Sequence, residues 1–158
     1  MSEDDGLAAL RRGEDPNILA RLRTGWAVLG ATQLLPGYCL LIHDGDADQL
    51  TDLPRAERTA FLADLALLGE AIAAVCAAAD PGFLRINYEV LGNAWHHLHG
   101  HVRARYTWED ERLRVGPVDL YGPALTDPRH AAGPAHDPLR AQLSAALTTI
   151  TRDAYAEL

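Results

Sequence analysis

Residues 97–106 read HLHGHVRARY, and with His96 they place four of the chain's seven histidines within six positions. Successive side chains of a β-strand point to opposite faces, so an extended run here carries His97, His99 and His101 on one face, about 6.6–7 Å apart, and His96 on the other. Three interpretations are open: histidines on a polar sheet face, a metal site, or a nucleophile that acts at phosphorus. We favour the nucleophile, because imidazole forms covalent phosphoryl and nucleotidyl intermediates and flanking histidines can fix its tautomer.

The segments around this run alternate between strand and helix signals, which is typical of the α+β class. Strand-length segments lie at 26–30 (continued by 32–35), 38–42, 83–90 and 97–106, of which 38–42 is an apolar run and 97–106 alternates. Apolar residues three or four apart predict a long helix over 55–79, either continuous or broken near Gly69, and a closing helix over 138–157.

The remaining segments carry weaker signals. Asp15-Pro16 is a good helix start and predicts a short helix over 16–23, whereas the four prolines and three glycines of 115–135 predict a loop. Residues 1–15 are polar, and we expect them to be a flexible N-terminus. No linker divides the rest, so residues 16–158 are expected to form a single domain.

Composition narrows the class of protein. A formal net charge of −8 disfavours a nucleic-acid polymer as partner, since such binders normally present a basic face. The apolar stretches 61–68 and 71–79 are shorter than the about 20 residues of a membrane span, and the acidic start lacks a hydrophobic signal core; we expect a cytoplasmic protein. Cys39 and Cys76 lie in apolar runs without Cys-x-x-Cys spacing, which predicts buried free thiols.

The order of motifs over residues 26–106 resembles the histidine triad (HIT) superfamily. That family carries His-x-His-x-His on one strand, as in His97–His101, and a Gly-Gln or Gly-Asn pair whose glycine lies five residues before the first histidine, as in Gly92-Asn93. It also has a Pro-Gly-His-x-Leu-x-Ile hairpin, an x-Leu-x-Asp-Leu segment and a long helix. Here Pro36-Gly37-Tyr-Cys-Leu-Leu-Ile42, Gln49–Leu53 and the helix over 55–79 follow in that order.

The resemblance implies an HIT-like α+β fold, with an antiparallel sheet of about five strands, one long helix and terminal helices, in a homodimer. It implies that His99 is the middle histidine, which attacks the α-phosphate, between His97 and His101, which orient it and contact the phosphate. Asn93, next to Gly92, resembles the amide that binds the phosphate or the bridging oxygen. Asn87 lies near the family's ribose- and phosphate-contacting amide, one residue closer to the triad than usual.

Other positions near the triad bear on the substrate. Members that cleave phosphoramidates often have Ser or Thr where this chain has Ala94; because a nucleotide leaving group of low pKa needs no proton, Ala94 favours a phosphate anhydride. Arg103 and Arg105 could neutralise phosphate oxygens, and Trp95 is a candidate wall for a nucleobase.

The segment 108–119 resembles bacterial diadenosine tetraphosphate hydrolase-like members of the superfamily. The whole resemblance implies a nucleotide-phosphate hydrolase. It would cleave at the α-phosphate of a dinucleoside polyphosphate or related nucleotide through a nucleotidyl-histidine, with no cofactor and no metal. Two alternatives remain: a nucleotidyltransferase or phosphorylase that uses the same intermediate, and a non-catalytic nucleotide-binding module.

Overall fold

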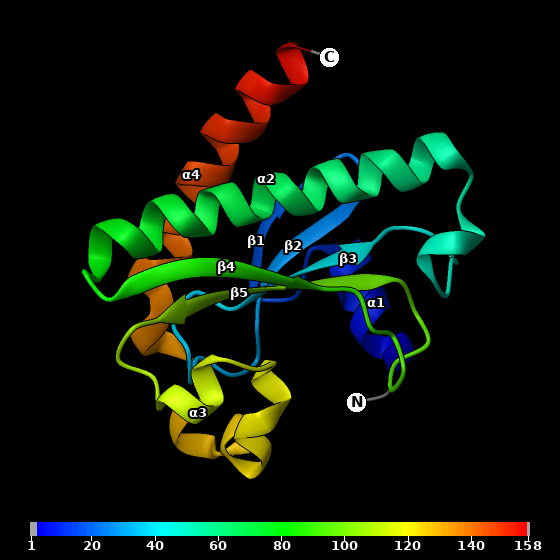
Figure 1. Cartoon of the computed structure of the whole chain (residues 1–158). Helices are drawn as coiled ribbons and strands as arrows, with labels where there is room; N and C mark the ends of the chain where they lie inside the picture. The colour runs from blue at the N-terminus through cyan, green and yellow to red at the C-terminus, as the bar shows by residue number, and fades with distance from the viewer. Residues whose placement is uncertain (1–2, 158) are drawn as a thin grey trace.

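The computed structural model describes residues 3–157 of the chain. Its centre is a five-stranded sheet of order β1-β2-β3-β5-β4, in which every neighbouring pair is antiparallel (Figure 1). The strands are β1 (Ile18–Arg21), β2 (Gly25–Leu29), β3 (Cys39–His43), β4 (Phe83–Glu89) and β5 (His99–Tyr106). The α+β class and the antiparallel sheet are therefore as expected.

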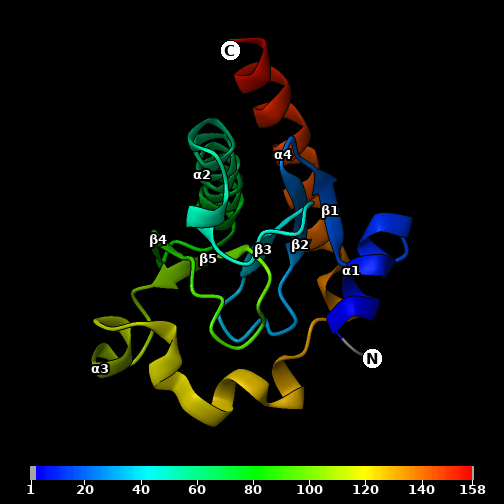
Figure 2. The ribbon, with the colours of Figure 1, turned by 90° about the vertical axis from the view of Figure 1, so that its right-hand side faces the viewer.

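Helices lie on both sides of this sheet. Figure 2 shows α2 and α4 on one side, and α1 together with the segment after α3 on the other. The helices are α1 (Glu3–Arg12), α2 (Arg55–Ala79), α3 (Glu111–Arg114) and α4 (Asp137–Ala156). Short 3₁₀ turns occupy Leu50–Asp52, Val118–Thr126, Pro128–His130 and Pro134–His136.

Alternation along β5 decides which side chains reach each face. Its even-numbered residues meet α2 and the core: a Cβ at Gly100 would come within 2.6 Å of Leu65, so a larger residue there would displace the Leu65 side chain. Val102 and Ala104 are fully buried in the same core. The odd-numbered residues, which include His99, His101, Arg103 and Arg105, therefore all point to the opposite face.

Helix α2 is continuous through Gly69, against which the Tyr88 ring packs at the place a Cβ would occupy. By length and composition α2 is long and apolar enough to cross a membrane, contrary to the expectation from its interrupted apolar runs. Eight of its residues are nevertheless buried within the domain, as in the core helix of a globular fold. Cys39 and Cys76 are buried free thiols, as predicted.

Three predictions of local structure were wrong. Residues 3–12 form α1, because Leu7 and Leu10 pack against a cluster that contains Trp26 and Ile42. The segment predicted as a helix at 16–23 contains β1, because pairing with β2 overrides its capping signals. Residues 32–35 do not continue β2; Thr32 makes only an isolated bridge to Ala131.

Candidate active site

His99 begins β5 and is almost fully buried. Its Nδ1 lies 2.6 Å from the carbonyl oxygen of His97, and since a carbonyl only accepts, Nδ1 carries the hydrogen and donates. In the neutral ring this leaves a lone pair on Nε2, the atom that can attack an electrophile. The main chain before β5 therefore sets the tautomer that a nucleophilic histidine needs.

His101 faces His99, with ring centroids 4.8 Å apart and planes at 71°. Its Nδ1 lies 2.8 Å from the Tyr38 hydroxyl. Burial, with smaller contributions from His99 and from the Arg103 guanidinium, lowers the pKa of His101 to about 4. His101 is therefore neutral near pH 7, and one ring nitrogen carries its only N–H.

His97 precedes β5 rather than lying in it, so strand alternation alone does not bring it to the triad. Its Nε2 donates to the carbonyl oxygen of His43 at 2.8 Å. The Trp95 ring stacks on His97 with centroids 5.0 Å apart and is 5.1 Å from His99. Trp95 also packs against the cluster that holds α1, so it supports the two histidines from outside the sheet.

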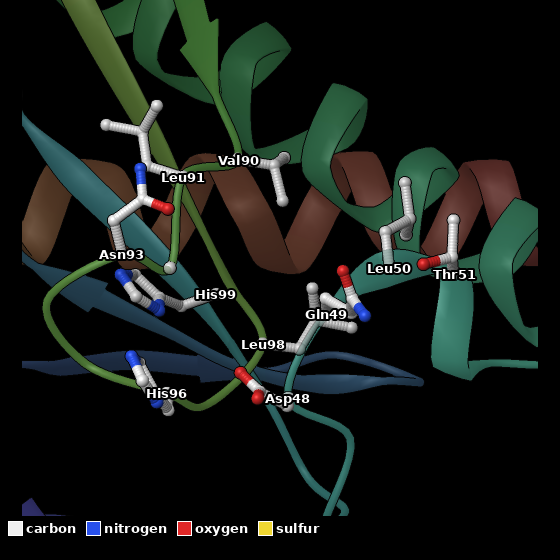
Figure 3. A pocket seen from close by; sticks show the side chains of 11 residues that line it. Asp48, Gln49, Leu50, Thr51, Val90, Leu91, Asn93, His96, Leu98 and His99 are labelled. Carbon is white, nitrogen blue, oxygen red and sulfur yellow. The ribbon is translucent and has the colours of Figure 1, made fainter.

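A cavity of about 430 Å³ opens beside His99. Figure 3 shows Asn93, His96 and His99 on one side of it and Gln49, Leu50 and Thr51 on the other. Gly92, also in the lining, has φ +70°, a conformation that an L side chain rarely adopts, so glycine permits the turn that places Asn93 here. The structure thus brings Gly92 and Asn93 together with His99.

Arg105 and Asn87 lie elsewhere. Arg105 follows His99 by six residues on the same face, about 20 Å along the strand. Its side chain is 2% exposed and is paired with Glu109 at 2.9 Å, and its Nη1 donates to Asn87 Oδ1. All its N–H groups have protein partners, which include the carbonyl oxygens of Leu113, Arg114 and Gly116. The structure therefore pairs Arg105 and Asn87 with each other, away from His99, and their predicted contact with phosphate stays a prediction.

Arg103 is the cation that the structure does place next to the triad. Its guanidinium carbon lies 3.8 Å from the centroid of the Tyr38 ring, and its Nε donates to Glu89 at 3.4 Å. Arg103 and Tyr38 line a second cavity of about 420 Å³, which Leu125–Asp127 and Ala131 close from the other side. The backbone bonds Gln33 N–H to His130 and Ala132 N–H to Ala31 hold this segment in place.

Sequence reasoning missed several residues of the two cavities. Tyr38 could have been singled out, because it stands at the histidine position of the Pro-Gly-His hairpin of the resembled family. Asp48–Thr51 also line the first cavity; Gln49–Leu53 matched a family segment by its sequence, but that match did not mark these residues as part of a site. Among residues 3–157, no group of three or more His, Cys, Asp or Glu side chains is placed to hold a metal ion.

Comparison with solved structures agrees with the fold. Similar solved structures include histidine triad proteins from Marinobacter aquaeolei (21% identity, 96% of each chain, TM-score 0.64) and Sinorhizobium meliloti (20% identity, 85% of this chain and 92% of that one, TM-score 0.65). A hypothetical histidine triad nucleotide-binding protein from Sulfolobus tokodaii matches at 13% identity over 92% of this chain and 93% of that one, with TM-score 0.63. At these identities the likeness shows the fold alone. No curated protein sequence matches the chain.

The HIT domain family model matches residues 17–108, from the start of the sheet to just beyond β5. This match covers more than half of the 158 residues and includes all three triad histidines and the Gly92-Asn93 turn. The chain therefore belongs to the HIT domain family.

Proposed function

We propose that this chain is a nucleotide-phosphate hydrolase that cleaves at the α-phosphate of a dinucleoside polyphosphate or a related nucleotide anhydride. The observation that carries the proposal is the hydrogen bond from His99 Nδ1 to the His97 carbonyl, which leaves the Nε2 lone pair free at the edge of a cavity. At about 430 Å³ the cavity is within the size range of small-molecule sites.

In the proposed reaction, His99 Nε2 attacks the α-phosphorus and forms an N–P bond. The bond to the leaving phosphate oxygen breaks, and that oxygen keeps the electron pair. Water then attacks the nucleotidyl-histidine, releases a nucleoside monophosphate and restores the imidazole. The N–H of neutral His101 and the amide of Asn93 stabilise the charge that develops on the phosphoryl oxygens.

Two features support an anhydride substrate. A phosphate leaving group of low pKa departs without a proton, and Ala94 provides no hydroxyl that could assist an amine. Arg103 supplies a cation on the same face, two residues beyond His101, where further phosphates of a polyphosphate chain would pass.

The test is a single-turnover incubation, in chelator, with α-labelled diadenosine tetraphosphate and, separately, adenosine 5′-phosphoramidate. Wild-type protein is expected to release labelled monophosphate from the anhydride and to carry acid-labile label transiently. His99→Ala should lose both by about 10³-fold or more, because it removes the nucleophile. His130→Ala, which removes a histidine outside both cavities, should retain both.

Cleavage by His99→Ala at the wild-type rate, or no cleavage of either substrate by wild-type protein, would contradict the hydrolase proposal. Added inorganic phosphate separates the transferase alternative, since capture of the intermediate by phosphate gives a labelled diphosphate. Tight binding of the tetraphosphate without turnover would instead identify a nucleotide-binding module.

We further propose that the protein works as a homodimer. The sheet order leaves β4 at an edge, and its side chains Leu84 and Tyr88 are 46% and 49% exposed. A second copy would cover this edge and pair its open backbone groups. Light scattering should give about twice the chain mass for wild-type protein and the chain mass for Leu84→Glu, and a wild-type monomer would contradict the proposal.

A further inference from the structure

In the described residues, the Tyr38 hydroxyl is the one side-chain group that hydrogen-bonds to Nδ1 of His101. We propose that Tyr38 is a positioning residue, which fixes His101 in the tautomer that carries its hydrogen on Nε2 and so aims an N–H at the substrate phosphate. The inference rests on the proposed function, in which His101 stabilises charge on the phosphoryl oxygens.

The direction of the hydrogen bond follows from the two groups. The phenol has one hydrogen, and the only side-chain acceptor within its reach in the described residues is His101 Nδ1, at 2.8 Å. The two rings are nearly parallel, with planes that differ by 16° and centroids 6.0 Å apart, where the hydroxyl meets Nδ1. Burial raises the pKa of Tyr38 despite the opposing charge of Arg103, which keeps the phenol protonated near pH 7. Nδ1 therefore accepts, and the hydrogen of neutral His101 is on Nε2.

Two contacts restrict the position of the Tyr38 ring. The Arg103 guanidinium lies 3.8 Å from the ring centroid on one side, and Glu89 anchors that guanidinium through Nε at 3.4 Å. Elsewhere around the ring, a Cβ at Gly30 would come within 2.1 Å of Tyr38 Cδ1, so only glycine leaves room for the phenol there. Tyr38 itself is 8% exposed. With its ring held in this way, the hydroxyl has little freedom to turn away from His101.

The tautomer matters because the ring presents opposite chemistry in its two forms. With hydrogen on Nε2, His101 offers a donor to an anionic oxygen bound next to His99. With hydrogen on Nδ1, the same position offers a lone pair, which repels the anion as its charge grows in the transition state. Removing the phenolic hydroxyl lets the ring exchange between the two forms and lowers the fraction of molecules ready to react.

The experiment combines ¹⁵N NMR of histidine side chains at pH 7 with steady-state kinetics on diadenosine tetraphosphate. We expect wild-type His101 to show the Nε2–H pattern of shifts and Tyr38→Phe to show a mixture. The kcat of Tyr38→Phe should fall about tenfold with KM changed by less than about threefold, because the lost hydrogen bond acts on the transition state through His101.

Tyr106→Phe is the matched control. Its hydroxyl is also buried but donates to the Pro36 carbonyl at 2.6 Å, on the side of β5 that faces α2. This variant should keep the wild-type kcat and the His101 tautomer, whatever stability it loses.

Two results would overturn the inference: an Nδ1–H tautomer in wild-type His101, or a Tyr38→Phe variant with an unchanged tautomer and kcat. The first needs no variant, so it stands even if Tyr38→Phe does not fold. Failure of the proposed function looks different, since wild-type protein would then show the Nε2–H tautomer without any turnover.

Discussion

The two ends of β5 carry polar side chains on the same face of the sheet but differ in how fully those groups are paired. At the first end, His99 donates through Nδ1 and has no partner for Nε2 in the described part of the chain. At the other end, every N–H group of Arg105 meets a protein acceptor. The end that can react is the one with an unpaired ring nitrogen next to a cavity. The end whose polar groups are all paired anchors the chain instead.

The Arg105 end explains how the chain after β5 is attached. Glu109 is completely buried, and it accepts from the Tyr106 backbone N–H at 2.7 Å and from the Tyr121 hydroxyl at 2.7 Å as well as from Arg105. Burial alone raises the pKa of the Glu109 carboxyl, but hydrogen bonds from Arg105, Tyr106 and Tyr121 outweigh it and hold the pKa below its ordinary value. The pair thus ties the segment that lines the second cavity to the sheet.

The largest effect expected from this comparison is on stability at the anchoring end. Arg105→Met leaves the Glu109 carboxylate buried without its cation, which should lower the free energy of unfolding by about 3–5 kcal/mol. Urea denaturation measures the loss, and turnover per folded molecule should stay close to wild type. Arg105→Met combined with Glu109→Leu is the control, since removing both charges should restore part of the stability. A stable single variant with impaired turnover would reverse the assignment of the two ends.

The same anchor should make stability depend on pH in one direction. Because the pKa of Glu109 is lower in the folded protein than in the unfolded chain, its contribution is present above its ordinary pKa and is lost as pH falls through the folded value. The difference in unfolding free energy between wild-type protein and Glu109→Gln should therefore shrink as pH falls from 7 toward 3. A difference that stays constant over this range would show that the carboxylate charge contributes nothing.

Two asparagines provide the smallest and sharpest contrast between the ends. Asn93→Ala should slow turnover by about tenfold and leave stability nearly unchanged, because the amide lines the cavity next to His99. Asn87→Ala should leave turnover unchanged and cost about 1 kcal/mol of stability, because it removes one acceptor of Arg105. The check is to measure kcat/KM and the urea midpoint of both variants. The opposite pattern would show that the substrate binds at the Arg105 end of β5 and not at the His99 end.

The sequence predicted the long helix, four of the strands and the triad, because periodic apolar runs and the spacing of His97, His99 and His101 are local signals. It did not predict the partner of Arg105, since Glu109 reaches it through a turn whose path depends on the folded chain. It also missed β1. The residues before β1 carry helix-capping signals, and only the pairing with β2 makes the segment a strand. The interpretation of Trp95 as a nucleobase wall was tied to its position beside the triad; in the structure its ring lies against His97 and His99.

The hydrogen bond that orients His99 ends on a carbonyl of the main chain. No codon change can delete a carbonyl group, so the tautomer of His99 survives any replacement at position 97 that preserves the course of the loop. Substitutions of the side chains around the cavities can change the preferred substrate during evolution. They leave the reactive Nε2 of His99 in place, because the hydrogen bond that orients it comes from the main chain. A variant library at position 97 should therefore vary in rate and selectivity and yet retain a reactive His99.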